Sequence, residues 1–139
     1  MVIQQLDNQL VDIIINHPDV RPTVEKGDHY ITSAELFNGE NIIYGSPLGA
    51  ILFVHKGGGV YEGHIAFLPQ GRGKAALQAC SEALDHLFRE HKARKVVASI
   101  PLMLRPARFL VRRLGFASEG VDPAKSVEHF VMEAESWAV

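Results

Sequence analysis

A short glycine-rich loop contains the residue types that bind a phosphate group. The stretch "QGRGKA" spans residues 70–75 and lies between a predicted strand and a predicted helix. A helix N-terminus presents unpaired backbone N–H groups and a partial positive charge, and Gly71 and Gly73 would let a ligand approach the backbone closely. Arg72 and Lys74 add two cationic donors. A plain strand-to-helix turn also favours glycine, so these residues alone leave both interpretations open.

The loop matches neither of the two common nucleotide-binding fingerprints. The phosphate-binding pattern GxxxxGK[ST] is absent, and so is the dinucleotide-binding pattern GxGxxG. The ligand class therefore has to be inferred from the elements around the loop.

Hydrophobic periodicity and turn residues predict those elements. A strand, a long helix and a second strand in succession imply a parallel strand pair, and the hairpin before them implies antiparallel neighbours. We therefore predict one domain over residues 1–139, of mixed α/β class, with a mostly antiparallel central sheet that contains one parallel pair and is flanked by helices. Predicted helices span residues 3–16, 33–39, 74–92 and 104–116, and predicted strands span 48–56, 60–69, 95–101 and 126–135. Residues 41–45 are too short to assign, and residues 117–126 read as a loop.

The loop and its surroundings resemble the GNAT superfamily, the GCN5-related N-acetyltransferases. Residues 70–75 match the family signature Q/R-x-x-G-x-G/A, and a second register aligns "RGK" with the family's "P-E-x-R-G-K-G". Downstream, "PARFLVRRLGF" is similar to the family's "A-x-x-L-Y-x-x-L-G-F". The resemblance spans residues 48–118, and the matching tail residues are Ala107, Leu110, Leu114, Gly115 and Phe116.

The resemblance implies a GNAT-like fold and an acyl-CoA-dependent N-acyltransferase that moves an acetyl group from acetyl-CoA to an amine by direct attack. In that family the loop binds the pyrophosphate of the cosubstrate, and the preceding strand pairs with the pantetheine amides. Carried over to this sequence, the expected cofactor-binding residues are Phe67, Leu68, Gln70, Gly71, Arg72, Gly73, Lys74, Ala75 and Ala76.

The predicted strand at 60–69 also supplies two candidate bases, Glu62 and His64. Alternation puts them on one face of the strand and puts Tyr61, Ile65 and Phe67 on the other, apolar face. His64 lies five residues before the end of this strand, roughly 17 Å at about 3.3 Å per residue, which is comparable to an extended pantetheine arm. A neutral amine is needed for attack, so a base near pH 7 is useful. The alternative is a solvated pair on a half-exposed strand.

Two positions depart from the family pattern. The family's asparagine after the next strand would fall at Leu104, and its tyrosine, often the general acid for the departing thiolate, would fall at Val111. These departures favour a second hypothesis, a GNAT-fold binding or structural module with weak or no turnover. The segment "GHIAFLPQGRG" also resembles compact phage and prophage products, some of them virion-associated.

Composition excludes several other classes. A net charge of −2 gives no general attraction to nucleic acid or to anionic membranes, and the arginine cluster at 105–113 contains one aromatic residue, Phe109, rather than a series that could stack on bases. The cluster is interpreted as a solvated helix face, with contact to the 3′-phosphate of CoA or to an acidic partner as the alternative. The seven histidines have no metal-ligand spacing, and the single cysteine, Cys80, lies on an apolar helix stripe and suits a reducing compartment. We expect a cytoplasmic protein, virion-associated if phage-derived, with no metal, no membrane contact and an amine acceptor that the sequence does not identify. The C-terminal "SWAV" reads as a frayed tail or a contact in a homodimer.

Overall fold

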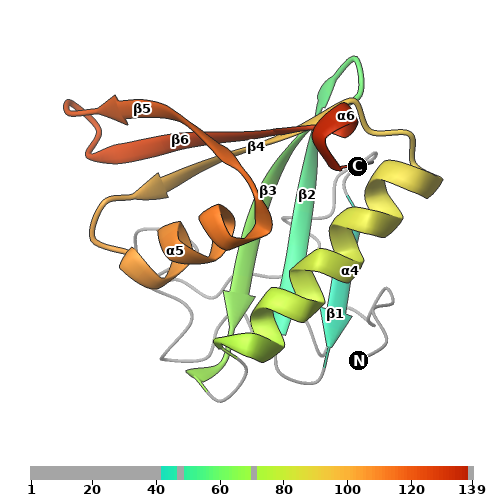
Figure 1. The fold of residues 1–139 in the computed structure, drawn as a ribbon, viewed down its shortest axis with the longest axis horizontal. Helices are drawn as coiled ribbons and strands as arrows, with labels where there is room; N and C mark the ends of the chain where they lie inside the picture. The colour runs from blue at the N-terminus through green and yellow to red at the C-terminus, as the bar shows by residue number, and fades with distance from the viewer. Residues whose placement is uncertain (1–41, 47–48, 70–71, 138–139) are drawn as a thin grey trace, which may run out of the picture.

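The computed structural model in Figure 1 describes residues 42–46, 49–69 and 72–137. The predicted helices at 3–16 and 33–39 lie outside the described residues. So do Leu48, at the start of a predicted strand, and the loop residues Gln70 and Gly71.

The described strands form one six-stranded sheet in the order β1-β2-β3-β4-β6-β5. Neighbouring strands are antiparallel except β3 and β4, which are parallel. The predicted mixed sheet with one parallel pair is therefore confirmed. The strands are β1 (Ile42–Ser46), β2 (Gly49–Gly57), β3 (Val60–Phe67), β4 (Lys95–Pro101), β5 (Ala117–Asp122) and β6 (Val127–Glu133).

The parallel pair is short because β3 and β4 diverge. Their pairing runs only from Val60–Lys95 to Glu62–Val97, although both strands continue beyond this point. Figure 1 shows the two strands separating toward the end of β3. Beyond Glu62, the edge of β3 that faces β4 has no strand partner among the described residues. Beyond the Glu62–Val97 pair, the backbones of β3 and β4 therefore separate, and we call this gap in the strand pairing the opening.

Helix α4 (Lys74–Glu90) crosses from the end of β3 to the start of β4. It begins where predicted and ends two residues early, because His91 forms the C-cap by donating its backbone N–H to the Leu87 carbonyl. The apolar stripe faces the sheet, as its spacing requires. Its buried residues are Ala76, Ala79, Cys80, Ala83, Leu84 and Leu87.

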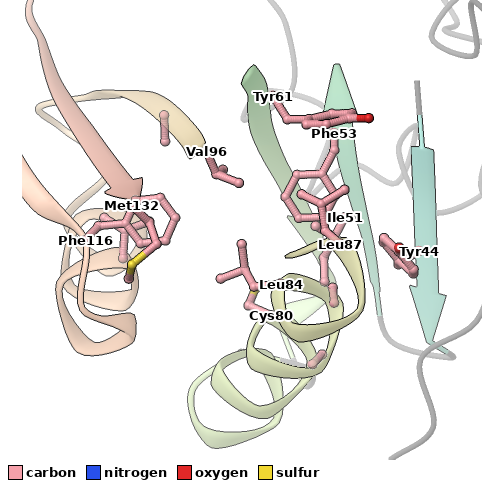
Figure 2. Packing of buried hydrophobic residues seen from close by; sticks show 14 of the residues in the cluster. Tyr44, Ile51, Phe53, Tyr61, Cys80, Leu84, Leu87, Val96, Phe116 and Met132 are labelled. Carbon is pink, nitrogen blue, oxygen red and sulfur yellow. The ribbon is translucent and has the colours of Figure 1, made fainter. Parts of the chain in front are cut away.

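Helix α5 (Arg105–Leu114) packs beside α4 on the same face of the sheet (Figure 1). A proline in the first turn begins the helix, and Gly115 ends it in the left-handed conformation with a φ of 100°. The two helices and the sheet enclose one apolar cluster, and Figure 2 shows side chains from α4 and from the strands pointing toward one another. Its largest fully buried side chains are Phe130, Leu87 and Val96.

The sequence did not identify β1, because five residues are too few for a periodic signal. The structure places Ile42–Ser46 antiparallel to β2, with Ile43 and Tyr44 buried. Pairing with a neighbouring strand and burial of these two side chains stabilise this strand, and neither can be read from so short a run.

The C-terminal third also differs from the prediction. Residues 117–122, predicted as a loop, form the edge strand β5, which is almost wholly exposed and is held by backbone pairing with β6. The last predicted strand ends at Glu133 and is followed by the short helix α6 (Ala134–Trp137). Trp137 stacks on Phe88 of α4 at 6.0 Å between ring centroids, and its indole N–H donates to Asp85. Trp137 is therefore held by contacts with α4 rather than frayed, and the contact in a homodimer stays a prediction.

The packing of α4 predicts how strongly one side chain stabilises the fold. Leu87 is 0% exposed, so Leu87→Ala should lower the free energy of unfolding by about 2–5 kcal/mol in urea denaturation. Met103→Ala is the control, because Met103 is 83% exposed and its loss should change stability by less than about 0.5 kcal/mol. Equal effects of the two substitutions would contradict the packing in Figure 2.

Candidate functional site

The N-terminus of α4 is open, with no side chain capping it. Gly73 is the N-cap, with a φ of 78° and a ψ of −131°, a conformation that L side chains rarely adopt. No side chain hydrogen-bonds to the cap, and the first turn contains no acidic residue. The first helical bond runs from the Leu77 N–H to the Gly73 carbonyl, so the N–H groups of Lys74, Ala75 and Ala76 have no acceptor within the helix. These donors can bind an anion.

Arg72 connects this helix start to the end of β3. Its Nε donates to the Phe67 carbonyl at 3.1 Å, and its backbone N–H donates to the Pro69 carbonyl at 3.3 Å. The sequence predicted Arg72 as a donor to a ligand, whereas in this structure its Nε contacts the backbone of β3. The Phe67 side chain is buried, and Leu68 is half-buried at the edge of the opening.

Close packing at the end of β3 also depends on Gly49. A Cβ at Gly49 would lie 2.2 Å from Cδ1 of Phe67, its partner across the β2–β3 pair. The Phe67 ring therefore occupies the space that any larger residue at position 49 would need. This fixes the Phe67 side chain at the end of β3.

Glu62 and His64 lie together at the other end of β3. His64 Nε2 and Glu62 Oε1 are 2.8 Å apart, and Lys56 Nζ is 3.9 Å from the same oxygen. The His64 side chain is 49% exposed and the Glu62 side chain 29% exposed. Glu62 is also the last β3 residue paired with β4, so the pair stands where the opening begins. The structure brings these two candidate bases together, and their catalytic role stays a prediction.

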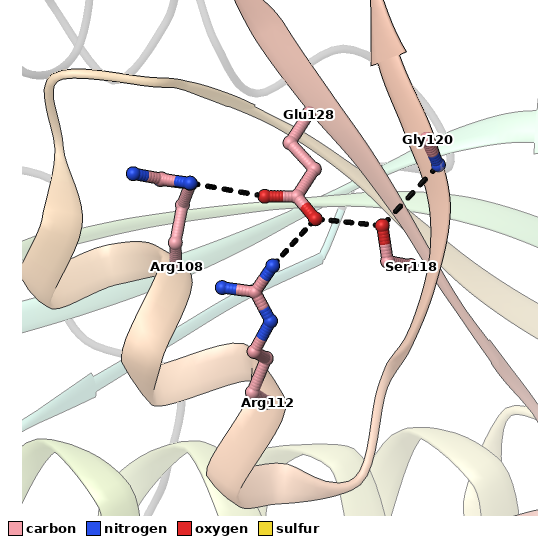
Figure 3. Close-up of polar contacts among 5 residues, drawn as sticks. All are labelled: Arg108, Arg112, Ser118, Gly120 and Glu128. Atoms are coloured by element: carbon pink, nitrogen blue, oxygen red, sulfur yellow. Dashed lines mark hydrogen bonds and ion pairs between the residues drawn. The ribbon is translucent and has the colours of Figure 1, made fainter.

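A buried carboxylate holds α5 against β5 and β6, and sequence reasoning missed it. Glu128 of β6 accepts hydrogen bonds from Arg108 at 3.2 Å, from Arg112 at 2.6 Å and from the Ser118 hydroxyl at 2.6 Å (Figure 3). The hydrogen bond from Ser118 lowers the pKa of Glu128 below its ordinary value of 4.5, burial opposes this shift, and the two arginines reinforce it. The Ser118 oxygen in turn accepts from the Gly120 N–H at 3.2 Å.

This network corrects the interpretation of the arginine cluster. The sequence favoured a solvated helix face, with contact to a ligand phosphate as the alternative. Instead Arg108 and Arg112 pair with Glu128, which is 4% exposed, and Arg112 also lies over the Phe130 ring at 5.2 Å. A signal was available, because alternation places Glu128 on the same strand face as Phe130 and Met132.

The two positions that depart from the family pattern contribute to packing. Leu104 is the N-cap of α5 and packs against the apolar cluster, and Val111 is buried within it. Neither can donate or accept a proton through its side chain. Any proton transfer in this site must use other groups.

The remaining predictions concern Cys80, metal binding and membrane-spanning helices. Cys80 is buried, and burial raises the pKa of its thiol to about 12, which favours the inert core thiol over a nucleophile. Within residues 42–46, 49–69 and 72–137, no three His, Cys, Asp or Glu side chains form a cluster that could hold a metal ion. In the same residues, no helix has the length and apolarity needed to cross a membrane.

Solved structures share this fold. A GNAT-family acetyltransferase from Bacillus anthracis aligns with a TM-score of 0.73 at 16% identity, over 96% of this chain and 94% of that one. Spermidine N-acetyltransferase from Vibrio cholerae, in complex with CoA and spermine, aligns with a TM-score of 0.79 at 15% identity, over 99% and 98%. Ribosomal-protein-S5-alanine acetyltransferase from Vibrio fischeri aligns with a TM-score of 0.71 at 12% identity, over 97% and 93%.

These likenesses establish the fold, which is that of the GCN5-related N-acetyltransferases. No family model matches the sequence, and no curated protein matches it.

The Glu128 network predicts a pH dependence of stability. Because the folded pKa of Glu128 is lowered, its contribution is complete above 4.5 and is lost as the pH falls through the folded pKa. Wild type should therefore be more stable than Glu128→Gln at neutral pH, and the difference should shrink on acidification below 4.5. Urea denaturation across this range measures it. Glu119→Gln, at an exposed position of β5, is the matched control and should show no such convergence.

Proposed function

We propose that this chain is an acyl-CoA-dependent N-acyltransferase that moves an acetyl group from acetyl-CoA to an amine by direct attack. The observation that supports this most is the opening between β3 and β4, which lies beside an uncapped helix N-terminus. One end of the cosubstrate carries phosphates and the other an acyl thioester, joined by an extended arm with two amides. The opening and the helix start offer donors for both parts.

The pyrophosphate is assigned to the loop and the first turn of α4. The N–H groups of Lys74, Ala75 and Ala76 point out of the helix start, and the Lys74 side chain is exposed. Gln70 and Gly71 complete the proposed loop, although they lie outside the described residues. Arg72 remains in the proposed set, and its Nε bond to Phe67 ties the loop to the strand that receives the arm.

The pantetheine arm is assigned to the open edge of β3. An extended ligand with amide groups can bind such an edge as an added strand would, through backbone hydrogen bonds. Phe67 and Leu68 lie at the end near the loop, and the edge runs from there to Glu62, where β4 takes over the pairing. The Phe67 carbonyl has two lone pairs, so it can accept from a pantetheine amide while it accepts from Arg72.

Glu62 and His64 are assigned to the acceptor amine. The amine must lose a proton as its nitrogen attacks the thioester carbonyl carbon, and His64 can take that proton while Glu62 orients the imidazole across 2.8 Å. Both side chains are partly exposed, so they can exchange the proton with water. The carbon–sulfur bond then breaks and CoA leaves as the thiolate.

The acceptor class is open between small polyamines and protein N-termini. Structural neighbours are named for spermidine and for an alanine of ribosomal protein S5, and one is a complex of Mycobacterium smegmatis RimJ with CoA-disulfide. Spermidine, spermine and a peptide with an N-terminal alanine are therefore the first amines to test.

A binding or structural module on the same fold is the second candidate function. The apolar side chains of Leu104 and Val111 favour it, because both sit where the resemblance places polar groups. This candidate would be distinguished from the enzyme if the protein bound CoA but released no thiol from acetyl-CoA with any amine. A phage origin, virion association, a cytoplasmic location, a homodimer and the lack of nucleic-acid binding all stay predictions.

Acetyl-CoA should stabilise the folded protein. At about 100 times its dissociation constant, a ligand that binds only the folded state raises the free energy of unfolding by about 2.7 kcal/mol. Lys74→Ala should weaken binding at least about ten-fold, since a hydrogen bond to a charged group contributes about 1.5–3 kcal/mol. Thermal melts with acetyl-CoA titrations measure both effects. Lys125→Ala, at an exposed lysine in the turn between β5 and β6, is the control and should bind as wild type does. A melt unmoved by millimolar acetyl-CoA and CoA would contradict the function and the ligand together.

The base assignment predicts a loss of turnover without a loss of binding. His64→Gln and Glu62→Gln should each lower kcat, about 10²-fold or more for the group that takes the proton, and should keep the acetyl-CoA melt shift. Thiol release with the three amines measures the rate, and His91→Gln, at the exposed C-cap of α4, should match wild type. If both variants release CoA at the wild-type rate, the pair is a solvated surface contact and the base lies elsewhere.

A further inference from the structure

A second hydrogen-bonded pair lies on the strands beside the opening, and the proposed function does not use it. The Ser99 hydroxyl of β4 and Nδ1 of His129 on β6 are 2.8 Å apart. The two residues are directly opposite each other in the antiparallel β4–β6 pairing. Ser99 is exposed and His129 half-buried, so this contact is not part of the core.

The strand register places this pair on the same sheet face as Glu62 and His64. Glu62 pairs with Val97, and residues paired across a sheet share a face. Ser99 is the next residue on that face of β4, as His64 is the next on that face of β3. The two strands diverge at this point, so the two pairs stand on either side of the opening.

The chemistry of acyl transfer needs a proton where the thioester breaks. The departing CoA thiolate is stabilised when it is protonated as it leaves. The two positions where the resemblance places polar groups offer no proton donor, because Leu104 and Val111 are apolar. Of the residues that form β3 and β4, Tyr61 and Ser99 carry hydroxyls, and Tyr61 is 7% exposed within the apolar cluster. Ser99 is therefore the accessible hydroxyl on the strands that border the opening.

We propose that Ser99 is the catalytic proton donor to the departing CoA sulfur and that His129 is the positioning residue that restores the proton. This inference rests on the proposed function. As the amine nitrogen bonds to the carbonyl carbon and the carbon–sulfur bond breaks, the Ser99 hydroxyl proton moves to the sulfur. The Ser99 oxygen takes a proton from Nδ1–H of a protonated His129, which water then reprotonates. His64 has taken one proton from the amine, so the protons balance.

Charged groups around His129 come from each adjoining strand. Among residues 42–46, 49–69 and 72–137, the hydrogen-bond partner of the His129 ring is Ser99. The titratable residues of the adjoining strands are Lys95 of β4, Glu133 of β6, and Glu119 and Asp122 of β5, while Glu62 and His64 stand across the opening.

The test varies the leaving group. Ser99→Ala should lower kcat with acetyl-CoA about 10²-fold, while the melt shift with acetyl-CoA stays at the wild-type value. With S-(4-nitrophenyl) thioacetate, whose weakly basic aryl thiolate leaves without a proton, Ser99→Ala and wild type should react at equal rates. Ser99→Thr keeps the hydroxyl and should restore most of the acetyl-CoA rate. Ser136→Ala, at an exposed serine of α6, is the matched control.

His129→Gln separates positioning from structure. A glutamine amide can hydrogen-bond to the Ser99 hydroxyl but cannot return a proton to it, so kcat with acetyl-CoA should fall about 10²-fold while the rate with S-(4-nitrophenyl) thioacetate stays at the wild-type value. An unchanged acetyl-CoA rate in Ser99→Ala, an equal loss with both acyl donors, or a wild-type acetyl-CoA rate in His129→Gln would each overturn the proposal and leave the acyltransferase function standing. If wild type binds no acetyl-CoA or releases no thiol with any of the three amines, the function fails, and this inference fails with it.

Discussion

The separation of β3 from β4 is the constraint on which the rest of the structure depends. β4 is paired with β6 along its whole length, from Lys95–Glu133 to Pro101–Val127, so its backbone is satisfied on that edge. Its other edge pairs with β3 for three residues and then parts from it. An unpaired edge inside a sheet leaves backbone donors and acceptors without partners, which is costly unless water or a ligand satisfies them. Among the described residues this edge has no strand partner, and the proposed function assigns it to an extended ligand with amide groups.

Helices α4 and α5 pack on one face of the sheet and hold β3 and β4 in their positions. α4 starts at the end of β3 and returns the chain to the start of β4, and its apolar stripe contacts both halves of the sheet (Figure 2). α5 is held against β5 and β6 by a different interaction. The buried Glu128 carboxylate accepts hydrogen bonds from Arg108 and Arg112 of α5 and from Ser118 (Figure 3). A buried carboxylate without partners would be strongly unfavourable. Because Arg108 and Arg112 must reach Glu128, this contact restricts the position of α5 on the sheet.

The two faces of the sheet have separate roles in the proposed site. The face under α4 and α5 holds the apolar cluster and, at one point, the buried Glu128 carboxylate. The opposite face holds the hydrogen-bonded pairs Glu62–His64 and Ser99–His129, one on each side of the opening. Polar pairs beside an open strand edge suit proton transfer, because water can exchange protons with groups that remain partly exposed.

The sequence by itself determined the mixed sheet with one parallel pair, the extents of α4 and α5 within two residues, and the alternation that brings Glu62 and His64 together. These follow from local periodicity, from Pro106 and Gly115, and from the long crossover between two strands. Only the tertiary structure decided β1, β5, the packing of Trp137, the Glu128 network and the Ser99–His129 pair. Each of these depends on a partner distant along the chain. Strand pairing and buried polar contacts become favourable only when that partner is positioned, and no local pattern records where the partner will lie.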